Sequence, residues 1–266
     1  ENRVTTVTSQ GQLDAKLITR DEPYYETRTT IDGWLLNDYV EFVFTSGNQH
    51  NILMIIGTNS QEGNFYLNYI KEKSIEDFTE SISNFYGDDA KDIVNLYINN
   101  SSENDITGAV SIYITDSWFL EPTNHLLKGM ESLNSSVYQY QFSIPNKKYP
   151  NLGAIHADEI KYVFNNLEGE ISENDKLIEK KMMSYWIQFA KSGNPNGKGL
   201  KRWRMYSSKK HNYLDFNILS NSSRRIKRRL PMVIVRILLV LYMRITVHRL
   251  TPSNKLTSFM LKTSLA

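Results

Sequence analysis

Five histidines could serve as a general base near neutral pH, and one of them stands in a setting that favours chemistry. His156 lies in NLGAIHADEI, between the alternating stretch VYQYQF and a short helical pattern. Loops that follow the strands of a parallel sheet gather at its carboxyl edge, where ligands bind. We therefore take His156 as the candidate base, although an isolated histidine more often has a structural or solvated role. The other four lie in polar turns, in a helical pattern or in a basic tail: His50, His211, His125 and His248.

Glu62 is the candidate carboxylate partner of that base. It stands in IIGTNSQEGNFYL, directly after the apolar run NILMIIG, so it also follows an expected strand. A carboxylate there could accept an imidazole N–H, fix the tautomer and stabilise the imidazolium formed during a reaction. The same position suits an acidic residue in the first turn of a helix, where the helix dipole favours it. Spacing alone leaves both interpretations of Glu62 open.

A nucleophile that would complete this pair is missing from the chain. There is no Cys, which excludes a thiolate nucleophile, disulfide bonds and Cys-based metal sites. Glu before His matches one known order of a catalytic triad, but the G-x-S-x-G and HGGG motifs that precede the acid in that order do not occur. The chain begins without Met and without a signal-peptide pattern. We therefore expect the nucleophile segment to lie upstream, and these 266 residues to be inactive alone.

Alternating strands and helices must position these residues. The apolar run 51–57 has β-branched residues and is closed by Gly57, which predicts a buried strand of a parallel sheet. VYQYQF in 136–142 and NYLDF at 212–216 predict two further strands, and Asp32-Gly33 predicts a turn. Helical patterns cover 74–87, 89–98, 109–127 with a break near Pro122, 157–164 and 172–196. Strands separated by helices indicate an α/β layer fold.

The segment 172–196 has the clearest helical pattern. Ser172 and Asp175 have the spacing of a capping box, and Gly193 marks the C-terminal end. Apolar residues recur at helical spacing along one stripe, which indicates core packing rather than a ligand surface: Ile178, Met182, Tyr185, Trp186 and Phe189.

The composition is globular, with 40% hydrophobic, 12% aromatic and 23% charged residues. The net charge of +2 is divided unevenly, because ten of the 31 Lys and Arg lie in residues 216–266, which hold no Asp or Glu. Residues 1–215 therefore have 21 basic against 29 acidic side chains. This asymmetry indicates an acidic domain followed by a different kind of tail, and the basic pI gives no ground for a nucleic-acid partner.

The tail SRRIKRRLPMVIVRILLVLYMRITVHRL (223–250) is basic and then apolar. Arg236 and Arg244 interrupt its apolar part, which is shorter than the roughly 20 residues of a transmembrane helix. A misjoined or frameshifted end is the first interpretation, and a membrane-surface helix or an anchor is the alternative. Sequons that permit a secreted, glycosylated protein occur at Asn99, Asn100, Asn134 and Asn221.

Collinear segments spanning about residues 28–216 resemble the type B carboxylesterase/cholinesterase family of α/β-hydrolases. The resemblance implies the C-terminal part of such a domain over residues 1–217, with a mostly parallel central sheet flanked by helices, and a separate tail over 218–266. The matching segments are IDGWLL, ILMIIGTNSQEGNFYL, TDSWFLEP, VYQYQF, GAIHADEIKYVF, and MMSYWIQFAKSGNPN followed by RWRMY.

The resemblance also implies roles for individual residues. Glu62 matches the acid of the catalytic triad and His156 the general base and acid. Glu159 matches a glutamate that supports the hydrogen-bond network of the site, with a solvated helix residue as the alternative. The implied reaction is hydrolysis of a small-molecule carboxylic ester through an acyl-enzyme, without cofactor or metal.

The family resemblance and the sequons together favour an extracellular location. The rival interpretation is a non-catalytic cholinesterase-like recognition or adhesion domain, or an inactive fragment. Retention of both Glu62 and His156 favours the enzyme.

Overall fold

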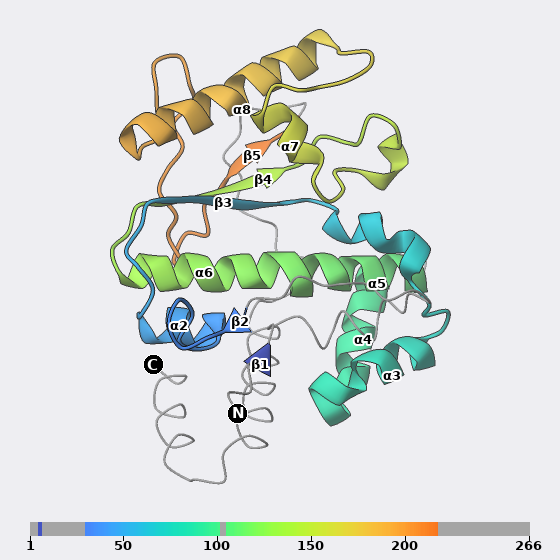
Figure 1. Cartoon of the computed structure of the whole chain (residues 1–266). Coiled ribbons are helices and arrows are strands. Elements are labelled where there is room, and N and C mark those ends of the chain that lie inside the picture. Colours follow the sequence, from blue (N-terminus) through green and yellow to red (C-terminus); the bar gives the residue numbers. More distant parts are fainter. Residues whose placement is uncertain (1–4, 7–29, 102–104, 218–266) are drawn as a thin grey trace.

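A computed structural model describes residues 5–6, 30–101 and 105–217 (Figure 1). Three strands form a parallel sheet in the order β3 (Met54–Asn59), β4 (Val137–Phe142) and β5 (Leu214–Phe216). Helices α7 (Asp158–Val163) and α8 (Glu173–Ser192) lie on one side of the sheet and α6 (Glu121–Ser132) on the other. This arrangement confirms the predicted α/β layer fold.

Strand β4 supplies side chains to both layers, because successive residues of a strand point to opposite faces. Tyr138 and Phe142 are buried in a cluster with residues of α7 and α8. Val137 is buried on the other face, with Leu127 and Met130 of α6. The alternation seen in the sequence of β4 therefore serves two cores, not one core and a solvated face.

Trp203 lies at the centre of the core that the sheet shares with α7 and α8. It is 2% exposed, and its indole Nε1 donates to the carbonyl oxygen of Gln139 at 2.9 Å. Ring centroids of Tyr138, Tyr185 and Phe216 lie between 5.4 and 6.0 Å from its own. The five apolar residues expected along one stripe of α8 all pack in this cluster, which confirms their core role.

Three helices form a second packed unit beside the sheet. They are α3 (Ile75–Tyr86), α4 (Ala90–Asn100) and α5 (Ile106–Ile114), with the 3₁₀ turn η2 (Gly87–Asp89) between the first two. Ser74 and Asp77 form a capping box at the start of α3, just as Ser172 and Asp175 do at the start of α8. Phe78 and Ile82 are fully buried between these helices, as the periodicity predicts.

The boundaries expected for the first strand are wrong. Residues 51–53 are exposed and precede the strand, and β3 continues past Gly57 to Asn59. Gly57 does not end the strand but pairs with Tyr140 on β4, whose ring lies against it. A Cβ at Gly57 would lie 2.4 Å from Tyr140 Cδ1, so the glycine permits close packing within the sheet. Residues 54–57 are only half-buried, since β3 is the edge of the described three-stranded sheet.

The predicted break near Pro122 is also wrong. The chain is helical from α5 through a π-helical segment, η4 (Thr115–Leu120), into α6. Pro122 lies in the first turn of α6, where its missing N–H is tolerated. The wide turn before it absorbs the change in hydrogen bonding that the proline imposes, and such π segments often occur at functional sites.

The N-terminal part contributes little to the sheet. Two short strands, β1 (Thr5–Thr6) and β2 (Thr30–Ile31), pair antiparallel, and α2 (Val40–Ser46) packs on α6. Asp32 accepts three backbone N–H bonds in the expected turn, whose Gly33 has φ +73°. Within the described ranges, no helix is long and apolar enough to span a membrane. The rest of the polar lead-in, the sequon at Asn221, His248 and the tail 218–266 lie outside the described residues.

Candidate active site

Glu62 and His156 meet at the carboxyl edge of the sheet. Glu62 begins the 3₁₀ helix η1 (Glu62–Tyr69), three residues after the end of β3. His156 lies between the 3₁₀ turn η5 (Pro150–Leu152) and α7, in the loop that follows β4. Because β3 and β4 are parallel neighbours, their loops emerge at the same edge. His156 Nδ1 lies 2.8 Å from Glu62 Oε2.

The carboxylate of Glu62 is buried and held at both oxygens. The residue is 5% exposed, and its Oε1 accepts the backbone N–H of Asn59 at 2.7 Å while Oε2 faces the imidazole. Glu62 is therefore at the start of a helix, but the two hydrogen bonds that fix its carboxylate go to Asn59 and His156. Position in the helix and contact with the histidine, the two alternatives left open by spacing, coexist in one residue.

His156 is partly open to solvent and electrostatically tied to Glu62. Its side chain is 42% exposed, in contrast to 6% for that of Glu62. The hydrogen bond that His156 donates to Glu62 raises the pKa of His156 and outweighs the opposing effect of burial, with the charges of Glu62 and Glu159 adding to it. With Nδ1 engaged, Nε2 is the ring nitrogen left for proton transfer.

Three aromatic rings surround the imidazole. The ring centroids of Phe65, Tyr66 and Phe119 lie 5.8, 6.3 and 5.0 Å from that of His156. Phe65 and Tyr66 come from η1, and Phe119 comes from the π-helical segment η4. The rings make an apolar wall beside a titratable group that is partly open to solvent. The sequence gives no signal for this wall, since η4 is far from His156 along the chain.

Glu159 lies on α7 and reaches the pair through Asn59. The Asn59 amide Nδ2 donates to Glu159 Oε2 at 2.6 Å and to the carbonyl oxygen of Ile155 at 2.7 Å. Burial raises the pKa of Glu159, and the hydrogen bond from Asn59 partly offsets that rise. Glu159 is thus a hydrogen-bonded, half-buried residue rather than a solvated one. Asn59 was not identified from the sequence.

Hydrogen bonds of backbone and side chains join the loop before His156 to the segment around Glu62. The Gln61 N–H donates to Ala154 O, and the Ala154 N–H donates to Gln61 Oε1, both at 3.0 Å. Asn64 Nδ2 donates to Leu152 O at 2.8 Å. Ala157, directly after His156, has φ +68°, a left-handed conformation that costs a non-glycine residue about 1 kcal/mol. These ties hold the histidine loop in a conformation it would not favour alone.

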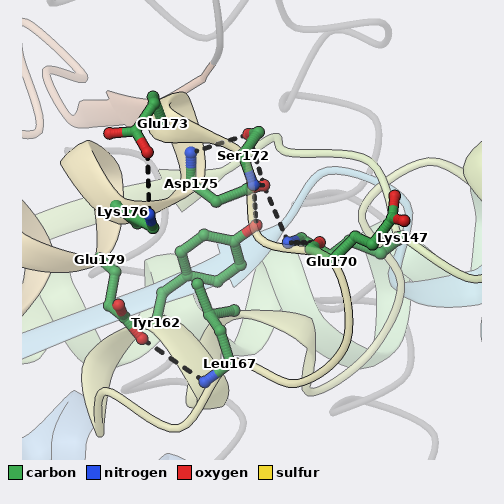
Figure 2. A network of polar contacts seen from close by, with 9 residues as sticks. All are labelled: Lys147, Tyr162, Leu167, Glu170, Ser172, Glu173, Asp175, Lys176 and Glu179. Atoms are coloured by element: carbon green, nitrogen blue, oxygen red, sulfur yellow. Dashed lines mark hydrogen bonds and ion pairs between the residues drawn. The ribbon is translucent and has the colours of Figure 1, made fainter.

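A polar network anchors the far side of the same loop to α8 (Figure 2). Asp175 accepts from Tyr162 Oη and pairs with Lys147 Nζ, each at 2.8 Å, and it caps α8 together with Ser172. Burial alone would raise the pKa of Asp175, but the bonds from Lys147, Ser172 and Tyr162 outweigh it and lower the pKa to about 2. Lys147 and Tyr162 flank His156 in sequence, so this network fixes both ends of the segment that contains it.

The remaining described histidines lie elsewhere. His125 is on α6 with Nε2 3.1 Å from Glu41 O, His50 is exposed, and His211 is in a turn with φ +46°. Among residues 30–101 and 105–217, no group of three or more His, Asp and Glu side chains could hold a metal ion. Of the sequence candidates, the structure brings Glu62, His156 and Glu159 together.

Comparison with known proteins identifies relatives of this sequence. The sequence is 31% identical to human (Homo sapiens) cocaine esterase over 123 residues, 43% of this chain and 22% of that protein. It is 28% identical to carboxylesterase 5A of Canis lupus familiaris over 218 residues, 71% of this chain and 37% of that protein. It is 34% identical to bile salt-activated lipase of Rattus norvegicus over 127 residues, 44% and 21% of the two chains.

The chain thus spans well under half the length of the curated relatives that it matches. A family model described as the carboxylesterase family, an α/β-hydrolase family, matches residues 4–231. That match covers most of the 266 residues, and the expected α/β-hydrolase fold agrees with the observed sheet. This chain belongs to the carboxylesterase family.

Proposed function

We propose that the polypeptide containing these residues is a serine-type carboxylic ester hydrolase, in which Glu62 is the acid and His156 the general base and acid. One observation carries the proposal: a carboxylate 5% exposed lies 2.8 Å from the Nδ1 of a histidine whose side chain is 42% exposed. A buried acid that orients a partly open imidazole is the pairing that nucleophilic hydrolysis requires.

The proposed reaction proceeds in two steps. His156 Nε2 takes the proton of a serine hydroxyl as its oxygen bonds to the ester carbonyl carbon, and the imidazolium then protonates the leaving alcohol as the C–O bond breaks. Water next gives a proton to His156 and attacks the acyl-enzyme, and the proton returns to the serine oxygen as the acid product leaves. Glu62 keeps the Nδ1 tautomer and stabilises each imidazolium.

The proposal places the nucleophilic serine outside these 266 residues, which contain no G-x-S-x-G. Names of the relatives, such as cocaine esterase and bile salt-activated lipase, point to small carboxylic esters as the substrate class. The aromatic wall of Phe65, Tyr66 and Phe119 suits an apolar acyl or alcohol group.

The test uses the whole polypeptide that contains these residues. A fluorophosphonate probe labels an activated serine, and p-nitrophenyl butyrate reports turnover. His156→Gln should lower kcat by about 10⁶-fold and Glu62→Gln by about 10⁴-fold, because the first removes the base and the second leaves the imidazole wrongly oriented. His50→Gln is the matched control, since His50 is exposed and precedes β3, whereas Glu62 follows the other end of that strand.

Two results would count against the enzyme. Full turnover in His156→Gln would remove the base from the mechanism. A wild-type protein that the probe does not label and that does not hydrolyse the ester would support the non-catalytic recognition domain instead.

An extracellular location is part of the same proposal. Three sequon asparagines lie in described residues and are exposed: Asn99, Asn100 and Asn134. Exposed acceptors are what glycosylation in the secretory pathway needs. Protein produced in a eukaryotic secretory host should lose mass on treatment with peptide N-glycosidase, and no change would contradict use of these sites.

A further inference from the structure

We propose that Asn59 is the positioning residue of the Glu62–His156 pair: its backbone and side chain together fix the separation between the end of β3 and the histidine loop. The inference rests on the proposed function only in calling the pair functional. It comes from three hydrogen bonds made by one buried residue at the last position of the strand.

The first contact is with the acid. The Asn59 N–H donates to Glu62 Oε1 at 2.7 Å, while the other carboxylate oxygen faces His156 at 2.8 Å. When a strand-end N–H holds one oxygen of a carboxylate, the direction in which the other oxygen points is fixed as well. The strand therefore sets the direction in which Glu62 points.

The second and third contacts are on either side of the base. Asn59 Nδ2 donates to Ile155 O at 2.7 Å and to Glu159 Oε2 at 2.6 Å. Ile155 directly precedes His156, and Glu159 follows it by three residues at the start of α7. One amide thus uses both of its hydrogens to hold the backbone before the histidine and the helix after it.

Burial makes these contacts consequential. Asn59 is 2% exposed, so water does not replace a lost donor there. Without the amide, a buried carbonyl and the Glu159 carboxylate would both lose a partner, and the residues on either side of His156 would lose their direct tie to the end of β3. The strained Ala157, φ +68°, lies in the segment that this amide spans.

Asn64 provides a matched control. Its Nδ2 donates to Leu152 O at 2.8 Å, so it ties the same loop to η1 through the same kind of bond. It has no hydrogen bond with Glu62, Ile155 or Glu159 among those of the described residues. Asn64→Ala loosens the loop at Leu152, four residues before His156, so it should lower the thermal stability as Asn59→Ala does but move the pKa of His156 less.

The experiment measures the pKa of His156 by NMR with selectively labelled histidine in the whole polypeptide, together with kcat and KM for p-nitrophenyl butyrate. Asn59→Ala should move the pKa of His156 part of the way to its value in Glu62→Gln. It should lower kcat by about 100-fold with KM unchanged, as a misplacement of about 1 Å does. Asn59→Ser has one hydroxyl donor in place of two amide hydrogens, so it should change the pKa of His156 and kcat in the same direction but by less. It replaces the alanine variant in the experiment if that variant does not fold.

The inference is overturned if the asparagine variants keep the wild-type pKa of His156 while Glu62→Gln lowers it. It is also overturned if Asn64→Ala lowers this pKa as much as Asn59→Ala does, because the effect would then be a general loosening. Failure of the proposed function looks different: the pKa order among the variants holds, but the wild-type protein neither reacts with the fluorophosphonate nor turns over ester.

Discussion

A single methyl group at Gly63 should displace the acid of the site. A Cβ built on Gly63 would lie 1.9 Å from the carbonyl oxygen of Ser111 on α5, whereas real Cβ contacts are not shorter than 3.0 Å. In Gly63→Ala, η1 and α5 must therefore part by about 1.1 Å, because neither backbone can be compressed. Glu62 directly precedes Gly63, so its carboxylate shifts with η1 and loses its alignment with His156.

The size of the effect follows from that displacement. A misplacement of about 1 Å lowers a rate by about 100-fold, so Gly63→Ala should reduce kcat for p-nitrophenyl butyrate by this factor. It should also lower the pKa of His156, since the Glu62 contact is what raises it. Both quantities are measured on the whole polypeptide, by hydrolysis and by histidine NMR.

Gly197→Ala is the control for this substitution. A Cβ there meets nothing closer than 3.5 Å, and the residue does not have a positive φ. It should keep the wild-type kcat and pKa of His156. A Gly63→Ala protein that kept the wild-type kcat and His156 pKa would refute the argument that close packing of η1 on α5 sets the position of Glu62.

Three further predictions concern stability and charge. Because the pKa of His156 is raised, its pairing with Glu62 stabilises the fold fully below the unfolded pKa of about 6.5 and loses that contribution as pH rises through the folded pKa. The free energy of urea unfolding should therefore differ more between wild type and Glu62→Gln at pH 5 than at pH 9. A larger difference at pH 9 would contradict this. Asp175, with a pKa lowered from 3.8 to about 2, stabilises the fold above pH 3.8 and ceases to do so as pH falls through 2. Asp175→Asn should lower the free energy of unfolding by up to about 2 kcal/mol at pH 7 and by little at pH 2. An equal loss at both pH values would exclude the charge as the cause. Trp203→Phe should cost about 1 kcal/mol for the lost bond to Gln139 O, and Trp203→Ala about 3–5 kcal/mol, both by urea unfolding; equal costs would mean that the indole contributes no packing.

Local patterns in the sequence predicted the elements well where one interaction sets the boundary. The serine that opens the pattern at 74, the capping box at Ser172 and the glycine at 193 mark helix ends that the structure confirms. Each of these signals lies within a few residues of the boundary that it sets. The continuous apolar run also indicated a strand of a parallel sheet, which the structure confirms, although the sequence did not predict which strands pair.

The errors arise where a distant residue decides. In the sequence Gly57 indicates the end of a strand, but in the structure it lies inside β3 and makes room for the ring of Tyr140 on the neighbouring strand. Pro122 reads as a helix break, but packing of α5 and α6 on the rest of the domain keeps the chain helical through the π turn. Tertiary contacts overrode the local preference in both cases.

The candidate site divides in the same way. His156 and Glu62 were singled out as candidates because each follows an expected strand, and Glu159 because of the family resemblance. Asn59 and Phe119 were not found, because nothing in their own neighbourhood of the sequence indicates that they face the histidine loop. Their partners are separated from them by long stretches of chain and become visible only in three dimensions.

Parallel pairing of β3 with β4 has a kinetic consequence. Glu62 and His156 are 94 positions apart, and the rest of η1, the helical elements α3, α4, α5, η4 and α6, and strand β4 lie between them. The helical insert contains mostly local contacts and can form quickly, whereas closing so long a loop is slow. The hydrogen bond between the two residues should therefore form late during refolding, after the helical signal in circular dichroism has developed. Any intermediate trapped earlier would have much of its secondary structure and no paired histidine.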